Sequence, residues 1–234
     1  MSTKKNGNPE HLHRLNELIR DHCTAEWRDL MGVHNERLSF KKGEQVFSQG
    51  GVADHMFMIH HGQVKVIAEY TQGNERVIRL AGDGEVLGHR GIGENQIYTA
   101  TVTALSDSTV NRIPMSLFHS VLKANNAFCY HFLMFFAEEM RILDNQLRDL
   151  MNMTVPQRVA RALKMNMDAF GFHEKDKRML AFTLSRKDIA SAADTTYESV
   201  IRTLAEFQEQ GIIELVGKRI RIRNKSKLMA AIKN

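Results

Sequence analysis

The 234-residue chain is long enough for two modest domains, and its 43% hydrophobic and 25% charged residues are ordinary for a soluble globular protein. A net charge of +5 suggests an acidic partner, and seven basic residues but no acidic one follow Glu214. The two cysteines fit no metal-ligand spacing, and no apolar run is long enough to span a membrane. We therefore expect a cytoplasmic protein with no structural metal, no iron–sulfur cluster and no disulfide framework.

In the first half of the chain, the spacing of apolar residues changes from that of a helix to that of short strands. Apolar residues at helical spacing predict one or two helices between His11 and Leu30. From Leu38 to Ile113, short apolar or alternating runs are separated by glycine turns such as Gly50-Gly51 and Gln72-Gly73-Asn74. This pattern is typical of an antiparallel jelly roll, a fold that encloses a small ligand in some proteins and only supports partners in others.

A long helix with a narrow apolar seam follows Pro114. Apolar residues alternate in spacings of three and four along it, at Leu133, Phe136, Met140, Leu143, Leu147 and Leu150. The opposite face is read as polar and includes Glu138, Glu139 and Arg141. A seam this narrow predicts a matching helix from a second copy, hence a homodimer, and charge at Met140 and Leu147 should then give monomers. The alternative is that the helix packs on the protein's own roll.

The segment Val155-Pro156-Gln157 interrupts this helix, and Pro156 suits the first turn of the next one. We place a hinge here, which divides the chain into a sensor unit (1–113), a dimerisation helix region (114–153) and a C-terminal unit (154–234). A helix is expected from Arg158 to Phe170. A charged loop should follow from Gly171 to Arg178, and then a short strand from Met179 to Phe182.

The stretch from Thr183 to Arg223 has the plan of a winged helix-turn-helix. Ser185 can cap a first short helix, and a second amphipathic helix spans about 195–209. Two short strands joined at Gly217-Lys218 then form a basic hairpin. In this plan the second helix enters the major groove of DNA and the hairpin lies against phosphates. The alternative is a small helical domain with a solvated charged hairpin.

Taken together, the roll, heptad helix and winged helix-turn-helix resemble the superfamily of the cyclic-AMP receptor protein and the fumarate-nitrate reduction regulator (Crp/Fnr). FKKGEQVFSQGGVADHMFMIHHGQVKV is similar to the family's opening strands, and DIASAADTTYESVIRTLAEFQEQGII to its DNA-binding signature. The resemblance implies an α+β protein that acts as a homodimeric transcription regulator, binds palindromic double-stranded DNA and works with RNA polymerase.

The same resemblance assigns DNA-binding residues. Glu198 and Arg202 align with the family's best-known base-contacting positions, and their chemistry implies G·C pairs in each half-site. The alternative is an i,i+4 ion pair between them, worth only about 0.3–0.5 kcal/mol. Tyr197 stands where the family often has a basic residue. The remaining expected contacts to bases or phosphates are Arg186, Thr195, Thr196, Ser199, Lys218 and Arg219.

The expected effector pocket departs from the family pattern. Aligned from Gly88, His89 replaces the glutamate that holds the ribose, and Tyr98 replaces the arginine that holds the cyclic phosphate, with Thr99 at the serine position. Arg90 is shifted by one residue, which in a strand would send it to the opposite face. Asp144 would repel an anion if it faced the pocket.

These departures make a response to cyclic AMP improbable. An iron–sulfur sensor would need more cysteines than Cys23, and a haem is not supported because His89 and His55 are candidates only by being histidines. A different small-molecule effector, or none, remains open. The other classes considered are a ligand-sensing or protein-docking module that does not read DNA, and an enzyme, which we reject because no phosphate loop, nucleophile elbow or metal motif occurs.

Overall fold

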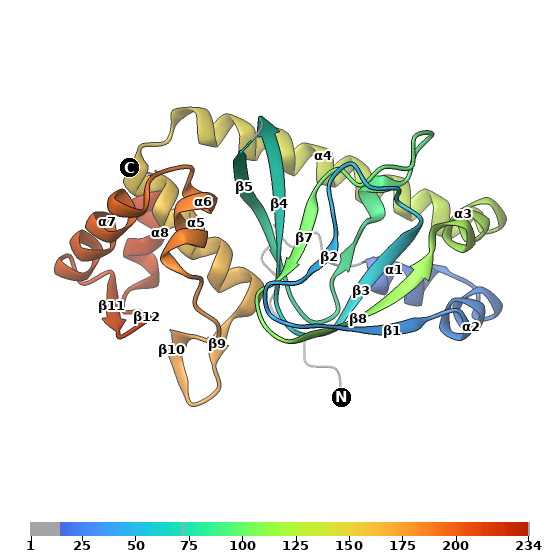
Figure 1. Cartoon of the computed structure of the whole chain (residues 1–234), viewed down its shortest axis with the longest axis horizontal. Helices are drawn as coiled ribbons and strands as arrows, with labels where there is room; N and C mark the ends of the chain where they lie inside the picture. The colour runs from blue at the N-terminus through green and yellow to red at the C-terminus, as the bar shows by residue number, and fades with distance from the viewer. Residues whose placement is uncertain (1–14, 72, 234) are drawn as a thin grey trace.

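The computed structural model describes residues 15–71 and 73–233, and its N-terminal half is an antiparallel roll (Figure 1). Two four-stranded sheets, with orders β1-β8-β3-β6 and β2-β7-β4-β5, face each other across the core. All of their pairings are antiparallel, as the glycine-punctuated runs predict. The strands are β1 (Glu36–Phe40), β2 (Gln45–Phe47), β3 (His55–His61), β4 (Val64–Thr71), β5 (Asn74–Ala81), β6 (Val86–Leu87), β7 (Thr101–Ala104) and β8 (Ser108–Pro114).

In the part of the chain that the structure describes, four helices flank the roll. The predicted N-terminal helical region is two helices, α1 (Leu15–His22) and α2 (Ala25–Val33). After the roll, α3 (Met115–Ala124) leads into the long helix α4 (Asn126–Asn152), whose first turn is capped by the side chain of Asn125. Figure 1 shows α4 running along the roll toward the C-terminal domain.

The C-terminal domain, which we call the head, is a winged helix-turn-helix. It comprises α5 (Val155–Phe170), β9 (Phe172–His173), β10 (Asp176–Leu180), α6 (Arg186–Ala193), α7 (Tyr197–Glu209), β11 (Ile213–Val216), β12 (Arg219–Ile222) and α8 (Lys225–Lys233). Thr154 and Gln157 form a capping box at the start of α5. The predicted place of Pro156 in the first turn of this helix is confirmed. One expectation is wrong. The segment 171–178 is not a loop, because β9 and β10 pair as a hairpin at the edge of the sheet β11-β12-β10-β9.

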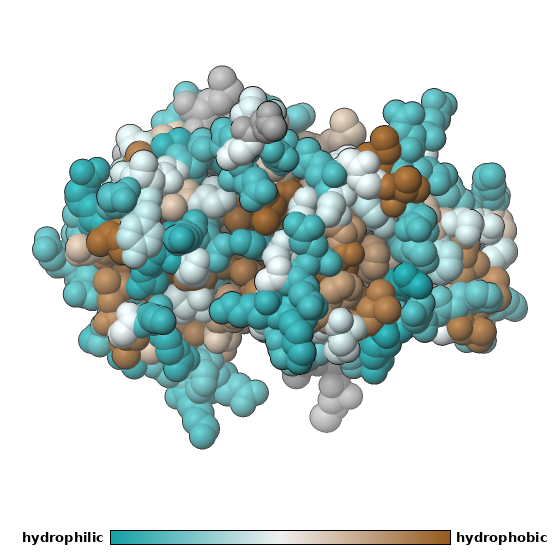
Figure 2. All heavy atoms as spheres, viewed as in Figure 1, coloured by the Kyte–Doolittle hydropathy of each residue, from teal (hydrophilic) through white to brown (hydrophobic). Residues whose placement is uncertain are grey.

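The head packs directly against the roll. Val77 and Leu80 of β5 belong to the same apolar cluster as Leu163 of α5 and Ile189 of α6. On the face shown in Figure 2, hydrophilic residues cover most of the surface, and hydrophobic atoms are visible between them over the head, the roll and the region where the two meet. No helix among residues 15–71 and 73–233 is long and apolar enough to cross a membrane.

Candidate DNA interface and effector cavity

Helix α7 is fixed on one side and open on the other. Thr196 caps it by accepting a hydrogen bond from the backbone N–H of Ser199 at 3.2 Å. Val200, Leu204 and Phe207 bury one face in the core of the head. The opposite face exposes Tyr197, Glu198, Ile201 and Arg202, so these side chains are free to contact a groove that the helix enters.

Arg202 is the most prominent cation of this face, with a side chain that is 74% exposed. Its guanidinium lies 4.0 Å from the carboxylate of Glu206, one turn further along α7. The ion pair between Glu198 and Arg202, considered above as the alternative to base contacts, is therefore not the one the structure makes. Arg202 instead pairs with the residue one turn toward the C-terminal end of α7, and the Glu198 side chain is exposed to solvent.

The β11–β12 hairpin is less basic than its sequence suggests. Gly217 adopts φ +59° in the tight turn, a conformation that favours glycine. Arg221 donates to both Asp176 and Glu214, and Arg223 also pairs with Glu214. Lys218 and Arg219 are exposed cations at the tip of the wing, whereas Arg223 is exposed but pairs with Glu214. Arg186 is half-buried and donates to the carbonyl oxygen of Lys218 at 3.3 Å, which ties the start of α6 to that tip.

A cavity of about 940 Å³ extends from the interior of the roll to the contact between roll and head. Five of the six predicted pocket residues line it: Gly88, His89, Arg90, Tyr98 and Thr99. The sixth, Asp144, is exposed on α4 and is not part of the lining, so its carboxylate does not face the cavity. The neighbouring Leu143 and Ile142 line the cavity in its place.

Tyr98 closes the end of the cavity where the family pattern has an arginine. Its ring stacks on Phe47 with centroids 4.0 Å apart, and its hydroxyl donates to the carbonyl oxygen of His55 at 2.8 Å. Burial raises the pKa of Tyr98 to about 12, so the hydroxyl stays protonated near neutral pH. Gly88 permits this arrangement, since an added Cβ would lie 3.2 Å from the Tyr98 ring. Tyr98 offers an anion no positive charge.

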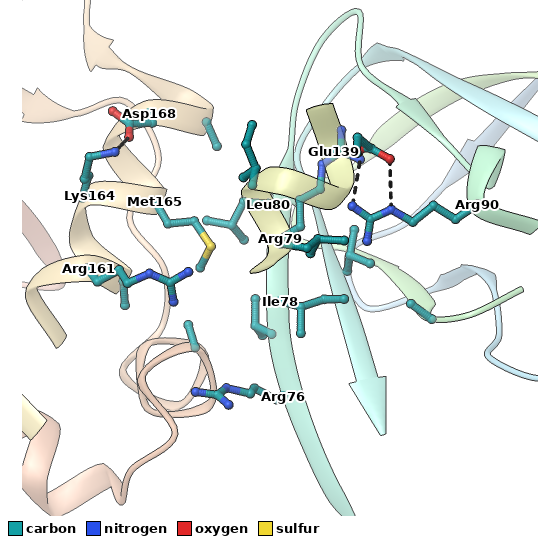
Figure 3. Close-up of a pocket in the computed structure, with 18 of the residues that line it drawn as sticks. Arg76, Ile78, Arg79, Leu80, Arg90, Glu139, Arg161, Lys164, Met165 and Asp168 are labelled. Atoms are coloured by element: carbon teal, nitrogen blue, oxygen red, sulfur yellow. Dashed lines mark hydrogen bonds and ion pairs between the residues drawn. The ribbon is translucent and has the colours of Figure 1, made fainter. Parts of the chain in front are cut away.

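His89 and Arg90 both bind Glu139 of α4. The Nε2 of His89 lies 3.2 Å from a Glu139 carboxylate oxygen, and Arg90 donates to both oxygens at 3.3 and 3.4 Å (Figure 3). Burial lowers the pKa of His89, so the ring is neutral at pH 7 and donates through Nε2. Burial opposes the ionisation of Glu139, but the hydrogen bonds from His89 and Arg90 and the charge of Arg90 outweigh it and hold the pKa of this carboxyl below its usual range.

This cluster corrects two sequence expectations. Residues His89–Gly91 form a 3-10 turn (η1), not a strand, so consecutive side chains are not sent to opposite faces. Glu139, expected on the polar face of α4, is only 2% exposed. The cluster therefore joins the roll to α4 by an ion pair, at the position where the family pattern places the ribose contact.

Helix α4 also carries an exposed apolar stripe. Leu133 and Met140, two of the predicted seam residues, are 60% and 65% exposed. Phe136 and Leu143 instead turn toward the roll, Phe136 packing on its core and Leu143 lining the cavity. The seam's last two members, Leu147 and Leu150, have side chains outside the described residues. The stripe is formed by Tyr130, Leu133, Met134, Ala137 and Met140, spaced as one face of a helix.

Sequence models of two domain families match this architecture. Residues 37–125 match the cyclic nucleotide-binding domain, and residues 157–231 match the Crp-like helix-turn-helix domain. The chain belongs to the Crp/Fnr family of DNA-binding transcription regulators. Its α+β fold, with an antiparallel roll and a helix-turn-helix head, is the one that the resemblance implies.

Full-length relatives support this assignment. The chain is 26% identical, over 82% of its length and 85% of the relative's, to a CRP-like cAMP-activated global transcriptional regulator of Mycobacterium tuberculosis. It is 29% identical, over 79% and 81%, to a probable transcriptional regulator, flp, of Lacticaseibacillus casei. FixK2 from Bradyrhizobium japonicum shares the fold at 21% identity, with a TM-score of 0.74 over 84% of this chain and 96% of that one.

Proposed function

We propose that this Crp/Fnr-type regulator is a homodimer that places α7 of each head in the major groove of a palindromic DNA site. The observation that carries the proposal is the exposed face of α7, where Glu198 and Arg202 stand clear of the core. Arginine can pair bidentately with guanine and glutamate can accept from cytosine N4, so G·C pairs are expected in each half-site. Thr195, Thr196, Ser199, Arg186, Lys218 and Arg219 lie around this face and supply contacts to phosphates or base edges.

The α4 stripe supports the homodimer. A two-fold axis through it would bury five apolar side chains that otherwise face water, and would repeat the same contact on both copies. Two heads related by such an axis match the symmetry of a palindromic site. A regulator of this kind works in the cytoplasm with RNA polymerase.

The roll does not respond to cyclic AMP in the usual way. Tyr98 occupies the phosphate end without a charge, and His89 and Arg90 are engaged by Glu139. A cyclic phosphate buried there would gain no cationic partner from either family position, and a buried charge that is left unpaired is costly.

The test is a binding selection from random duplex DNA, with purified protein at one stated salt concentration, run with and without cyclic AMP. We expect enrichment of a two-fold symmetric motif that does not depend on the nucleotide. Arg202→Ala should lose preference at one base position per half-site, and Glu209→Ala, at the far end of α7, is the control. A protein-docking module would enrich no motif with or without cyclic AMP, nor when the selection is repeated with other candidate effectors, and that outcome would overturn the proposal.

A further inference from the structure

The exposed face of α7 carries a largely apolar row of side chains beside its polar one. Tyr197, Ile201 and Ala205 follow one another at intervals of one helical turn, and all three are exposed. Glu198 and Arg202 form the neighbouring row, since each comes one residue later in the same turn. Residues three or four apart on a helix lie about 5–6 Å apart, so Ile201 shares one surface with Glu198, three residues earlier.

Ile201 is 43% exposed and has no place in the core of the head. Its neighbours Val200 and Leu204 belong to the buried cluster of the head, whereas among the described residues Ile201 is neither part of that cluster nor packed against it. A β-branched side chain also has a lower helix propensity than alanine or leucine. Neither packing nor helix formation therefore accounts for an isoleucine here. What distinguishes Ile201 is its place beside the two side chains proposed to contact bases.

We propose that Ile201 contacts the C5-methyl group of a thymine in each half-site. The inference rests on the proposed function, because only a helix that enters the major groove brings Ile201 to a base. In that groove the thymine methyl is the apolar group that base pairs present, and apolar side chains recognise it by contact. Glu198 and Arg202 distinguish hydrogen-bonding groups, but Ile201 has none and can recognise only such a methyl. An A·T pair is therefore expected next to the G·C pairs in each half-site.

The surroundings of Ile201 favour DNA over an apolar protein partner. Arg202 is exposed beside it, and Lys218 and Arg219 are exposed at the wing tip. Arg186 joins the start of α6 to that tip by donating to the carbonyl oxygen of Lys218. An apolar protein surface that covered Ile201 would bury the charge of Arg202 without a partner, which is costly. Base edges and phosphates instead supply acceptors for these cations, so the major groove suits both rows of α7.

The experiment removes only the methyl group. In the duplex obtained from the binding selection, each thymine is replaced in turn by deoxyuridine, which keeps every hydrogen-bonding group and lacks the C5-methyl. Binding of the full chain and its variants is titrated at one fixed salt concentration. We expect one thymine position per half-site at which the replacement weakens binding of the parent chain about fourfold, as for the loss of one buried methyl group. Ile201→Ser, which has a similar helix propensity, should bind thymine and uracil equally well at this position.

Two further variants test whether this effect belongs to Ile201. Ile201→Val keeps a β-branched apolar side chain and should keep most of the preference for thymine over uracil. Arg202→Ala should lose discrimination at its own base position and keep the full preference for thymine over uracil. Because both residues are exposed, thermal unfolding should show that every variant is as stable as the parent chain.

The outcomes separate this inference from the proposed function. A selected motif with no thymine position that responds to uracil, or with the same response in the parent chain and in Ile201→Ser, would overturn the role of Ile201 and leave the proposed function intact. The absence of any selected motif would overturn both. If Ile201→Ser kept the response to uracil but changed the oligomeric state in sedimentation, Ile201 would be a protein contact, and the proposal would again be overturned.

Discussion

Two roles are open to Arg202 from the sequence alone, a contact to a DNA base and an ion pair within α7. The side chain pairs at 4.0 Å with Glu206 and not with Glu198, and it is 74% exposed. An exposed pair of this kind contributes only about 0.3–0.5 kcal/mol to the stability of the helix. Replacing Arg202 should therefore change the affinity for DNA while leaving the free energy of unfolding nearly unchanged.

Arg202→Ala is expected to weaken binding to the selected site by about 1–3 kcal/mol, with the loss confined to one base position in each half-site. The measurement is a titration of the site and its single-base variants at fixed salt.

Lys218→Ala, which removes a cation from the wing tip, should instead weaken binding to all DNA sequences alike and make the binding constant less dependent on salt. These two variants therefore separate a base contact from a phosphate contact. If Arg202→Ala kept its full sequence preference, Arg202 would not be a base-contacting residue.

His89 makes a prediction about pH. Burial lowers the pKa of His89 in the folded state. As the pH falls below about 6.5, the unfolded chain therefore binds a proton at His89 while the folded chain does not. This term destabilises the fold between pH 7 and pH 5, by at most about 2 kcal/mol for one group. Glu139 does not titrate in that window, because its pKa is shifted downward and its stabilising contribution is lost only at more acidic pH.

His89→Gln keeps an N–H donor for Glu139 but cannot titrate. We expect this variant to lose less of its free energy of unfolding between pH 7 and pH 5 than the parent chain does, as measured by urea unfolding. The other histidines are common to both proteins and cancel in the comparison. Identical losses would show that the pKa of His89 is the same in the folded and unfolded states, and a smaller loss in the parent chain would show that the folded state holds the ring protonated.

At the scale of elements, local signals were predictable and nonlocal ones were not. Ser185 caps α6 and Pro156 lies in the first turn of α5, each as expected from residues within one turn of it, and Thr196 caps α7 in the same local way. The position of Glu139 could not be inferred in this way. Its partners His89 and Arg90 lie about fifty residues earlier, so a helical period alone assigns it to solvent.

The heptad seam predicted for α4 is only partly exposed, for a related reason. A helix that packs on its own roll along one face and exposes a second apolar face carries two hydrophobic patterns. A heptad pattern fitted to the sequence combines the two faces, so it assigns Phe136 and Leu143 to the same seam as Leu133 and Met140.

The corrected α4 stripe is testable. Leu133→Glu combined with Met140→Glu should produce monomers at micromolar concentration and abolish tight binding to a palindromic site, since charge on an apolar dimer face must be desolvated. Sedimentation velocity measures the oligomeric state. Val52→Glu, which adds the same charge at an exposed apolar residue of the roll, is the control and should leave the assembly unchanged. A stable dimer in the double variant would refute this interface.

At the scale of the whole molecule, the two domains are joined by specific polar contacts as well as by apolar packing. Lys65 of β4 donates to Asp188 of α6 at 2.6 Å, with side chains only 21% and 15% exposed. Ser191 of α6 accepts from the backbone N–H of Val77 at 3.0 Å and donates to the carbonyl oxygen of Glu75 at 3.2 Å. Because β5 is an edge strand, these bonds satisfy main-chain groups that the sheet leaves open.

This arrangement predicts that the head and the roll can separate without either unfolding. Lys65→Met keeps the side chain's apolar stem and removes its charge, which leaves Asp188 without that partner in a half-buried contact. Hydrogen exchange should then accelerate at the Val77 amide and along α6, while amides of β3 and β8 in the roll core keep their protection. Lys41→Met, which breaks the fully exposed pair with Asp107, should change neither region. Uniform acceleration across both domains would mean that roll and head unfold as one unit, and that the contact stabilises the whole fold instead of setting the position of the head.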